Sequence, residues 1–156
     1  MSTRANVIIE DKHSSLYFYR HSDGYPECTL KSLRRFMRIS TGFGATRANV
    51  SQAGGWLIIL GAIEYQTLPE GLFPENKKNV LDRTDDVIET VLDNLSFTDW
   101  KVGAYEPTTR IHGDVEFVYV LDLAKSEIRV YRAGDGEIGE LLATVTKFDV
   151  ADPVEE

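Results

Sequence analysis

The sequence predicts an α+β domain: an antiparallel sheet, made of an N-terminal hairpin and a C-terminal meander, with about three helices packed on one face. Three observations predict this fold class. β-rich runs joined by a short turn occupy the start of the chain, helical periodicity dominates its middle, and β-rich runs return in its last third. We expect residues 1–148 to form one domain and residues 149–156, which hold four acids and a proline, to form a flexible tail.

The first segment predicts a β-hairpin followed by a turn. Val7–Ile9 and Leu16–Tyr19 are rich in β-branched and aromatic residues, and the polar segment Lys12–Ser15 separates them. The segment Asp23–Pro26 should end the second strand, because Gly24 permits a positive φ angle and proline lacks the backbone donor.

The middle of the chain predicts three helices. Apolar residues recur at three- and four-residue steps over Thr29–Ile39, and Gly42 should end this first helix. A second helix is expected to begin with Ser51 as its N-cap. It should be buried on every side over Trp56–Ile63, which holds only apolar residues and glycine. A third helix begins near Thr84, where an apolar stripe alternates with exposed carboxylates.

Four β-rich runs in the last third, separated by turn residues at hairpin spacing, predict the meander. The second run is apolar on both faces, which predicts a central strand. The four runs are Trp100–Tyr105, Val115–Leu121, Glu127–Arg132 and Leu141–Phe148.

Composition narrows the function classes. The N-terminus has no apolar segment typical of a secretory signal, and no apolar run approaches the roughly 20 residues that span a bilayer. The single cysteine, Cys28, cannot form an internal disulfide, which suits the cytoplasm of a host cell. No C-x-x-C pair, P-loop or dinucleotide fingerprint is present, so we expect no metal, no cofactor and no membrane partner.

The net charge of −8 is unevenly distributed. Residues 1–50 hold eight Lys or Arg and four Asp or Glu, a net of +4, whereas residues 51–156 hold nine and 21, a net of −12. Duplex nucleic acid is bound by neutralising its phosphates, so the acidic bulk argues against such a partner.

A basic stripe lies within the first predicted helix. Its four members recur at i, i+3, i+4 and i+7 and share one face, which could clamp a small phosphorylated ligand or a partner's carboxylates. The alternative is a solvated face that pairs with the chain's own carboxylates. The stripe consists of Lys31, Arg34, Arg35 and Arg38, and Arg47 follows it beyond a glycine-bearing loop.

Two His-x-Asp segments, His21–Asp23 and His112–Asp114, are the other candidates for chemistry. His21 could act as a general acid or base oriented by Asp23, and Arg20 could hold an anion. The alternative is that both are turns in which the aspartate accepts hydrogen bonds from nearby backbone donors. Two such pairs alone are insufficient evidence for a metal site.

The string Tyr19–Pro26 resembles the signature of a loosely defined family of small proteins encoded by phages, prophages and plasmids. Members open with Ser-Thr-Arg-Ala, as residues 2–5 do, and carry a Tyr-x-His-x-Asp-Gly-Tyr-Pro turn. An Ala-Gly-Gly segment follows at Ala53–Gly55, and a late His-Gly-Asp-x-Glu strand is matched by His112–Tyr119. The resemblance implies an origin on a mobile element and a joint role for the two turns, but no reaction.

The hypothesis that we favour is a non-enzymatic phage-type accessory protein that counters a host defence system by binding a host protein or sequestering a nucleotide-like ligand. One alternative is a nucleotide-directed hydrolase or transferase that uses His21 and Asp23. Another is a structural accessory that forms a homodimer through a sheet edge. The candidate binding residues are Arg20, His21, Asp23, Tyr25, Lys31, Arg34, Arg35, Arg38, Arg47, His112 and Asp114.

Overall fold

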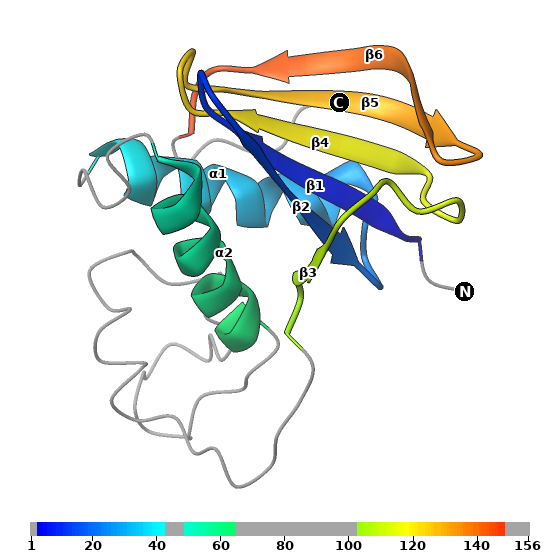
Figure 1. The fold of residues 1–156 in the computed structure, drawn as a ribbon, viewed down its shortest axis with the longest axis horizontal. Coiled ribbons are helices and arrows are strands. Elements are labelled where there is room, and N and C mark those ends of the chain that lie inside the picture. Colours follow the sequence, from blue (N-terminus) through cyan, green and yellow to red (C-terminus); the bar gives the residue numbers. More distant parts are fainter. Residues whose placement is uncertain (1–2, 43–48, 65–102, 149–156) are drawn as a thin grey trace, which may run out of the picture.

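The computed structural model describes residues 3–42, 49–64 and 103–148, which form a six-stranded mixed sheet and two helices (Figure 1). The α+β class is therefore confirmed. The strand order is β3-β2-β1-β4-β5-β6. The strands are β1 (Ala5–Glu10), β2 (Ser15–Arg20), β3 (Glu106–Thr108), β4 (Phe117–Asp122), β5 (Glu127–Gly134) and β6 (Glu137–Val145), and the helices are α1 (Pro26–Gly42) and α2 (Val50–Glu64).

The expectation of a purely antiparallel sheet is wrong at one place. Strands β1 and β4 are parallel, with Ala5 opposite Phe117 and Ile9 opposite Leu121. This pair joins the antiparallel β1–β2 hairpin to the antiparallel β4–β5–β6 meander, both of which the sequence predicts. A hairpin forces antiparallel pairing, whereas the long connection from β2 to β4 permits a parallel neighbour. Strand β4 lies between β1 and β5, which confirms the predicted central strand.

The strand that borders β2 in the sheet begins later in the chain than predicted. Of the strand predicted over Trp100–Tyr105, residues 100–102 lie outside the described residues, residues 103–105 are irregular, and β3 begins at Glu106. Strand β3 pairs with β2 through Tyr19 opposite Glu106 and Tyr17 opposite Thr108. It contains a proline, which cannot donate a hydrogen bond to a second neighbouring strand. This suits β3, because an edge strand has a neighbour on one side only.

Two helices are present in the described residues, and the third helix expected from Thr84 falls outside them, as does the predicted tail 149–156. Helix α1 covers the predicted segment and starts earlier, at Pro26, where the missing donor does no harm in a first turn. Its apolar stripe is fully buried against the sheet. The stripe consists of Leu30, Leu33, Phe36 and Met37. Neither described helix is long and apolar enough to cross a membrane.

Helix α2 differs from its prediction in two ways. The Asn49 side chain, not Ser51, caps it, because Asn49 Oδ1 accepts hydrogen bonds from the backbone N–H groups of Ser51 (2.8 Å) and Gln52 (3.2 Å). The helix is also not buried on every side, since Ile58 and Ile59 are 40% and 38% exposed. One side of α2 faces the sheet and the other does not.

Glycines explain why an unfavourable helix sequence packs closely here. A Cβ at Gly54 would lie 2.9 Å from Leu16 Cδ1 of β2, and one at Gly61 would lie 2.9 Å from the Tyr105 ring. Gly54 lets α2 approach β2, and Gly61 lets it approach the segment at Tyr105, more closely than alanine would allow. The cost in helix propensity is therefore offset by tertiary contact.

The sheet carries a core on each face. The larger core joins the helices to the face formed by Ala5, Val7, Ile9, Tyr119 and Leu121, among others. A smaller one occupies the opposite face, which we call the open face because neither described helix packs against it. The smaller core consists of Ile8, Tyr19, Val115, Val118 and Val120, with Tyr17, Ile111, Tyr131 and Ala133 packed around it.

Candidate functional site

The two His-x-Asp turns meet at Tyr19 on the open face. The Tyr19 ring centroid lies 4.5 Å from that of His21, in an edge-to-face arrangement at 87°, and 4.3 Å from that of His112 at 33°. His21 follows β2, whereas His112 lies between β3 and β4. Because β2 neighbours β3 and the β1–β4 pair brings the later turn alongside, side chains remote in sequence converge on one tyrosine.

Carboxylates complete what we call the Tyr19 cluster. The Tyr19 hydroxyl donates to Asp114 Oδ2 at 2.8 Å, and the Nε2 atom of His21 contacts Glu106 Oε1. The ring of Tyr19 is buried, whereas the side chains of His21, Glu106 and Asp114 are 52%, 48% and 53% exposed. The surface therefore presents an imidazole and two carboxylates around the buried ring of Tyr19. The cluster consists of Tyr19, His21, Glu106, His112 and Asp114.

Asn6 holds this surface from beneath. It is fully buried in β1, and its Nδ2 donates to the carbonyls of Phe18 (2.9 Å) and Arg110 (3.2 Å). Its Oδ1 accepts from the backbone N–H of His112 at 2.8 Å. Sequence reasoning missed Asn6. The available signal was a lone amide inside a β-rich run, a setting in which asparagine is depleted unless its polar groups find partners.

The environment of Tyr19 predicts a loss of stability at alkaline pH. Burial and the hydrogen bond to Asp114 raise the pKa of Tyr19 from 10.0 to about 12. The unfolded state loses this proton near pH 10 and the folded state near pH 12. The contribution of Tyr19 to the free energy of unfolding is therefore fully present below pH 10 and is lost as the pH rises from 10 to 12. Urea midpoints measured across this range should decrease less steeply for Tyr19→Phe than for the wild type. Equal slopes in the two proteins would contradict the assignment.

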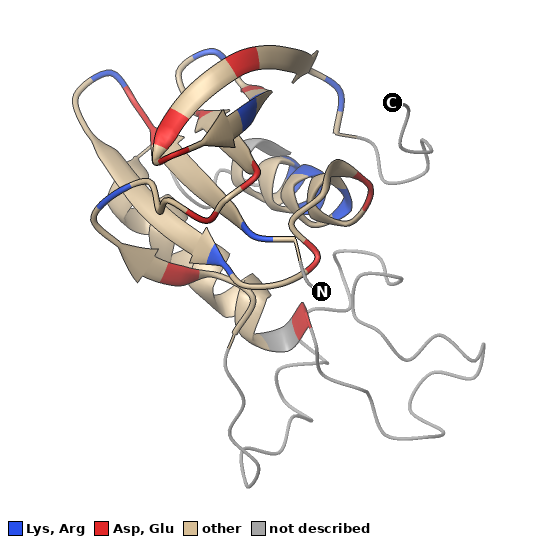
Figure 2. Cartoon of the chain, turned by 90° about the vertical axis from the view of Figure 1, so that its right-hand side faces the viewer, with Lys and Arg blue, Asp and Glu red and all other residues tan. Residues whose placement is uncertain are grey.

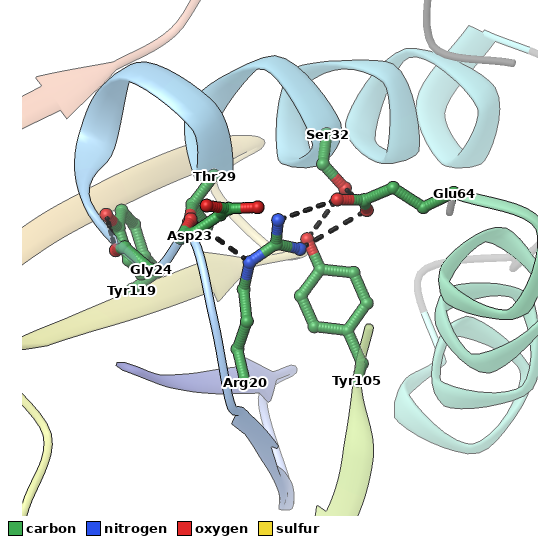
Figure 3. Close-up of polar contacts among 8 residues, drawn as sticks. All are labelled: Arg20, Asp23, Gly24, Thr29, Ser32, Glu64, Tyr105 and Tyr119. Carbon is green, nitrogen blue, oxygen red and sulfur yellow. Dashed lines mark hydrogen bonds and ion pairs between the residues drawn. The ribbon is translucent and has the colours of Figure 1, made fainter. Parts of the chain in front are cut away.

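Arg20, expected to hold an external anion, instead binds a carboxylate of its own chain (Figure 3). Strand alternation points it to the helix side, away from Tyr19. Its Nη1 and Nη2 donate to the two carboxylate oxygens of Glu64 at 3.2 and 2.6 Å, and its guanidinium lies 5.1 Å from the Tyr105 ring centroid. Arg20 and Glu64 are 1% and 3% exposed, so this pair is internal.

Two hydroxyls extend this buried contact. Ser32 Oγ donates to Glu64 Oε1 at 2.9 Å and lies 2.6 Å from the Tyr105 hydroxyl. We refer to Arg20, Ser32, Glu64 and Tyr105 as the Arg20 network. It joins β2, α1, the end of α2 and the segment before β3, and thus fixes the helices to the sheet.

Asp23 serves the turn and not the histidine. Its carbonyl accepts from Arg20 Nε (3.3 Å) and Thr29 Oγ1 (2.8 Å), and it adopts the positive φ of 57° that was expected of Gly24. Gly24 is required for a different reason, since a Cβ there would lie 2.9 Å from the carbonyl oxygen of Thr3. The carboxylate at His21 is therefore Glu106, so the predicted His21–Asp23 couple is replaced by a His21–Glu106 contact.

Tyr25 immediately precedes α1 and is 36% exposed. A hydrogen bond with the Cys28 thiol raises the pKa of its phenol. This contact joins residues three positions apart at the N-terminus of α1.

The basic stripe of α1 is not one exposed surface. Lys31 is exposed, Arg34 and Arg38 are partly buried, and Arg35 is only 2% exposed. Arg38 Nη1 donates to the Phe148 carbonyl at 2.8 Å. The Nε and Nη1 atoms of Arg34 are buried without a hydrogen-bond partner. The stripe lies on the helix side of the sheet, so it does not share a surface with the Tyr19 cluster, and Arg47 is outside the described residues.

Comparisons with known proteins add no identity. No protein-family model matches the chain, and neither a curated protein nor a solved structure matches it. Within residues 3–42, 49–64 and 103–148, no group of three or more His, Cys, Asp or Glu side chains is arranged to hold a metal ion.

Proposed function

We propose that this protein is a non-enzymatic binding protein that recognises a host protein through the Tyr19 cluster. The observation that carries the proposal is the convergence of both His-x-Asp turns on Tyr19, with the half-exposed side chains of His21, Glu106 and Asp114 around its buried ring. Preorganised groups lose little conformational entropy on association, which favours recognition. The resemblance to small proteins of phages, prophages and plasmids supports a role in the host cytoplasm against a defence system.

The charge of the cluster favours a protein over a nucleotide-like ligand. Its half-exposed carboxylates, Glu106 and Asp114, would repel phosphate groups and attract Lys or Arg. Among the described residues, Arg4 pairs with one of them, with its Nε 3.5 Å from Asp114 Oδ2. A basic host surface of the kind that normally meets nucleic acid therefore fits best, which agrees with the acidic bulk of the chain.

Affinity capture from host lysate with matched variants tests this proposal. The double variant His21→Ala/Glu106→Ala should lose the partner that the wild type retains, with an affinity loss of about tenfold or more for the reconstituted pair. Glu27→Ala, which removes an exposed carboxylate on α1, should bind as the wild type does. Equal capture by the double variant and the control would contradict the proposal.

A second measurement separates the proposal from the nucleotide-like alternative. Arg34 is partly exposed and has donors without a partner, so among the arginines of the stripe it is the one best suited to a phosphorylated ligand. We expect cyclic nucleotides to leave the melting temperature unchanged. A rise that disappears in Arg34→Gln would instead support sequestration of a nucleotide-like ligand and overturn the host-protein assignment.

A further inference from the structure

Strand β6 is the outermost strand of the sheet beyond β5 and is solvent-exposed along its length. All of its nine residues except Val145 are exposed. Figure 1 draws it as the orange strand at the rim, with no other described strand or helix on its outer side. Its outward N–H and C=O groups are therefore available to another chain.

Apolar side chains are concentrated on this edge. Ile138, Leu141 and Leu142 are 42%, 50% and 39% exposed, and they are among the seven large hydrophobic residues exposed in the described chain. Ile138 pairs with Ala133 and Leu141 pairs with Tyr131 across the strands. Paired residues project from the same face, so Ile138 and Leu141 extend the smaller core of the open face to the rim.

The strand has little of the protection that natural edges carry. Lysine, proline and inward charges usually block an edge, and Glu137–Val145 holds neither lysine nor proline. The protection that it has comes from register shifts on either side of Tyr131 in the β5–β6 pairing, because such irregularities bend and twist an edge strand. An exposed apolar edge with free backbone groups is the arrangement used for β-strand addition.

The acidic residues around β6 favour a basic partner segment over a second copy of this chain. From Ala133 to Thr146 the chain contains Asp135, Glu137 and Glu140 and no Lys or Arg. In Figure 2, red segments mark the acidic residues along the uppermost strand, β6. In a second copy paired antiparallel about Leu141, the two Glu140 residues would be diagonal neighbours, roughly 7–8 Å apart, and each chain carries a net charge of −8. Self-pairing is thus opposed, whereas a basic strand is attracted.

We propose that β6 accepts an extended segment of the partner protein as a seventh strand, with apolar side chains against Ile138 and Leu141 and Lys or Arg against Glu137 and Glu140. The inference rests on the proposed binding function and names the chemistry of the partner segment. Tyr19 itself lies on β2, four strands from β6, and the two surfaces can be tested with separate variants.

The experiment uses peptides of about ten residues that alternate valine with lysine, and a matched set that alternates valine with glutamate. Fluorescence anisotropy with the full chain should show binding of the lysine set only. Ile138→Lys/Leu141→Lys should weaken this binding about tenfold or more, while Ile58→Lys, which changes an equally exposed residue on α2, should not. Equal binding of both peptide sets, or no effect of the β6 variant, would overturn the proposal.

Two further arms distinguish the alternatives. Glu137→Lys/Glu140→Lys should reverse the preference toward the glutamate peptides, and unchanged preference would contradict the role of these carboxylates. Sedimentation velocity should show a monomer, whereas a dimer that Leu141→Lys dissociates would assign β6 to a second copy. His21→Ala/Glu106→Ala should leave peptide binding intact, so failure of the Tyr19 site and failure of the β6 site give different results.

Discussion

Replacement of Arg20 by methionine is expected to lower the free energy of unfolding by about 3–5 kcal/mol, because it leaves the Glu64 carboxylate buried without its cation. Glu64 is 3% exposed and would keep only the Ser32 hydroxyl among the contacts of the Arg20 network. Loss of the guanidinium also removes one of the two donors to the Asp23 carbonyl, and Thr29 Oγ1 remains. Urea denaturation with an unchanged m value would measure the effect.

Two companion variants make this expectation specific. Arg20→Met/Glu64→Met should recover most of the loss, since replacing both ions of a buried pair by apolar side chains of similar volume is often neutral or stabilising. Glu27→Gln, an exposed carboxylate, should change stability by no more than about 0.5 kcal/mol. If Arg20→Met were as stable as the wild type, the ion pair would not be part of the folded core.

Replacement of Asn6 by alanine is expected to cost about 2–4 kcal/mol, because three backbone groups, one buried and two partly buried, lose the hydrogen-bond partner that Asn6 provides. These are the carbonyls of Phe18 and Arg110 and the N–H of His112. Asn6→Asp should be no better, since its carboxylate retains the acceptor for His112 but faces two carbonyl oxygens. The free energy of unfolding measures the global effect.

Hydrogen exchange separates a local role of Asn6 from a general loss of stability. The His112 amide should exchange faster in Asn6→Ala by more than the Leu123 amide, which bonds to the Glu10 carbonyl and serves as an internal reference. The variant should also weaken capture of the host protein, because the His112 turn is no longer held against Tyr19. Equal acceleration of both amides would show that Asn6 supports the fold without positioning the site.

Local pattern predicted much of the fold. Alternation and turn residues identified the hairpin and the meander, and three- and four-residue spacing identified α1, because each depends on neighbours within a few positions. The same reasoning misplaced β3 and the cap of α2, where short segments satisfy several patterns equally well. It also overestimated the burial of Ile58 and Ile59, since apolar character does not say which side of a helix has a partner.

The candidate site was predicted only in part. His21, His112 and Asp114 were singled out from the sequence, and their joint role came from the resemblance to phage-type proteins. Glu106, Asn6 and the central place of Tyr19 were not foreseen. Arg20 was expected at the surface, yet its carboxylate partner lies 44 residues further along the chain and draws it into the core.

The sequence by itself determined which segments have strand alternation, which have helical periodicity, and how the net charge is divided between the two parts of the chain. These properties depend on composition and on near neighbours in the sequence. Only the tertiary structure decided that β1 pairs parallel with β4, that Arg20 meets Glu64 and that both histidines contact Tyr19. Such partners are separated by tens of residues, and their meeting depends on the chain path and the packing of the whole core.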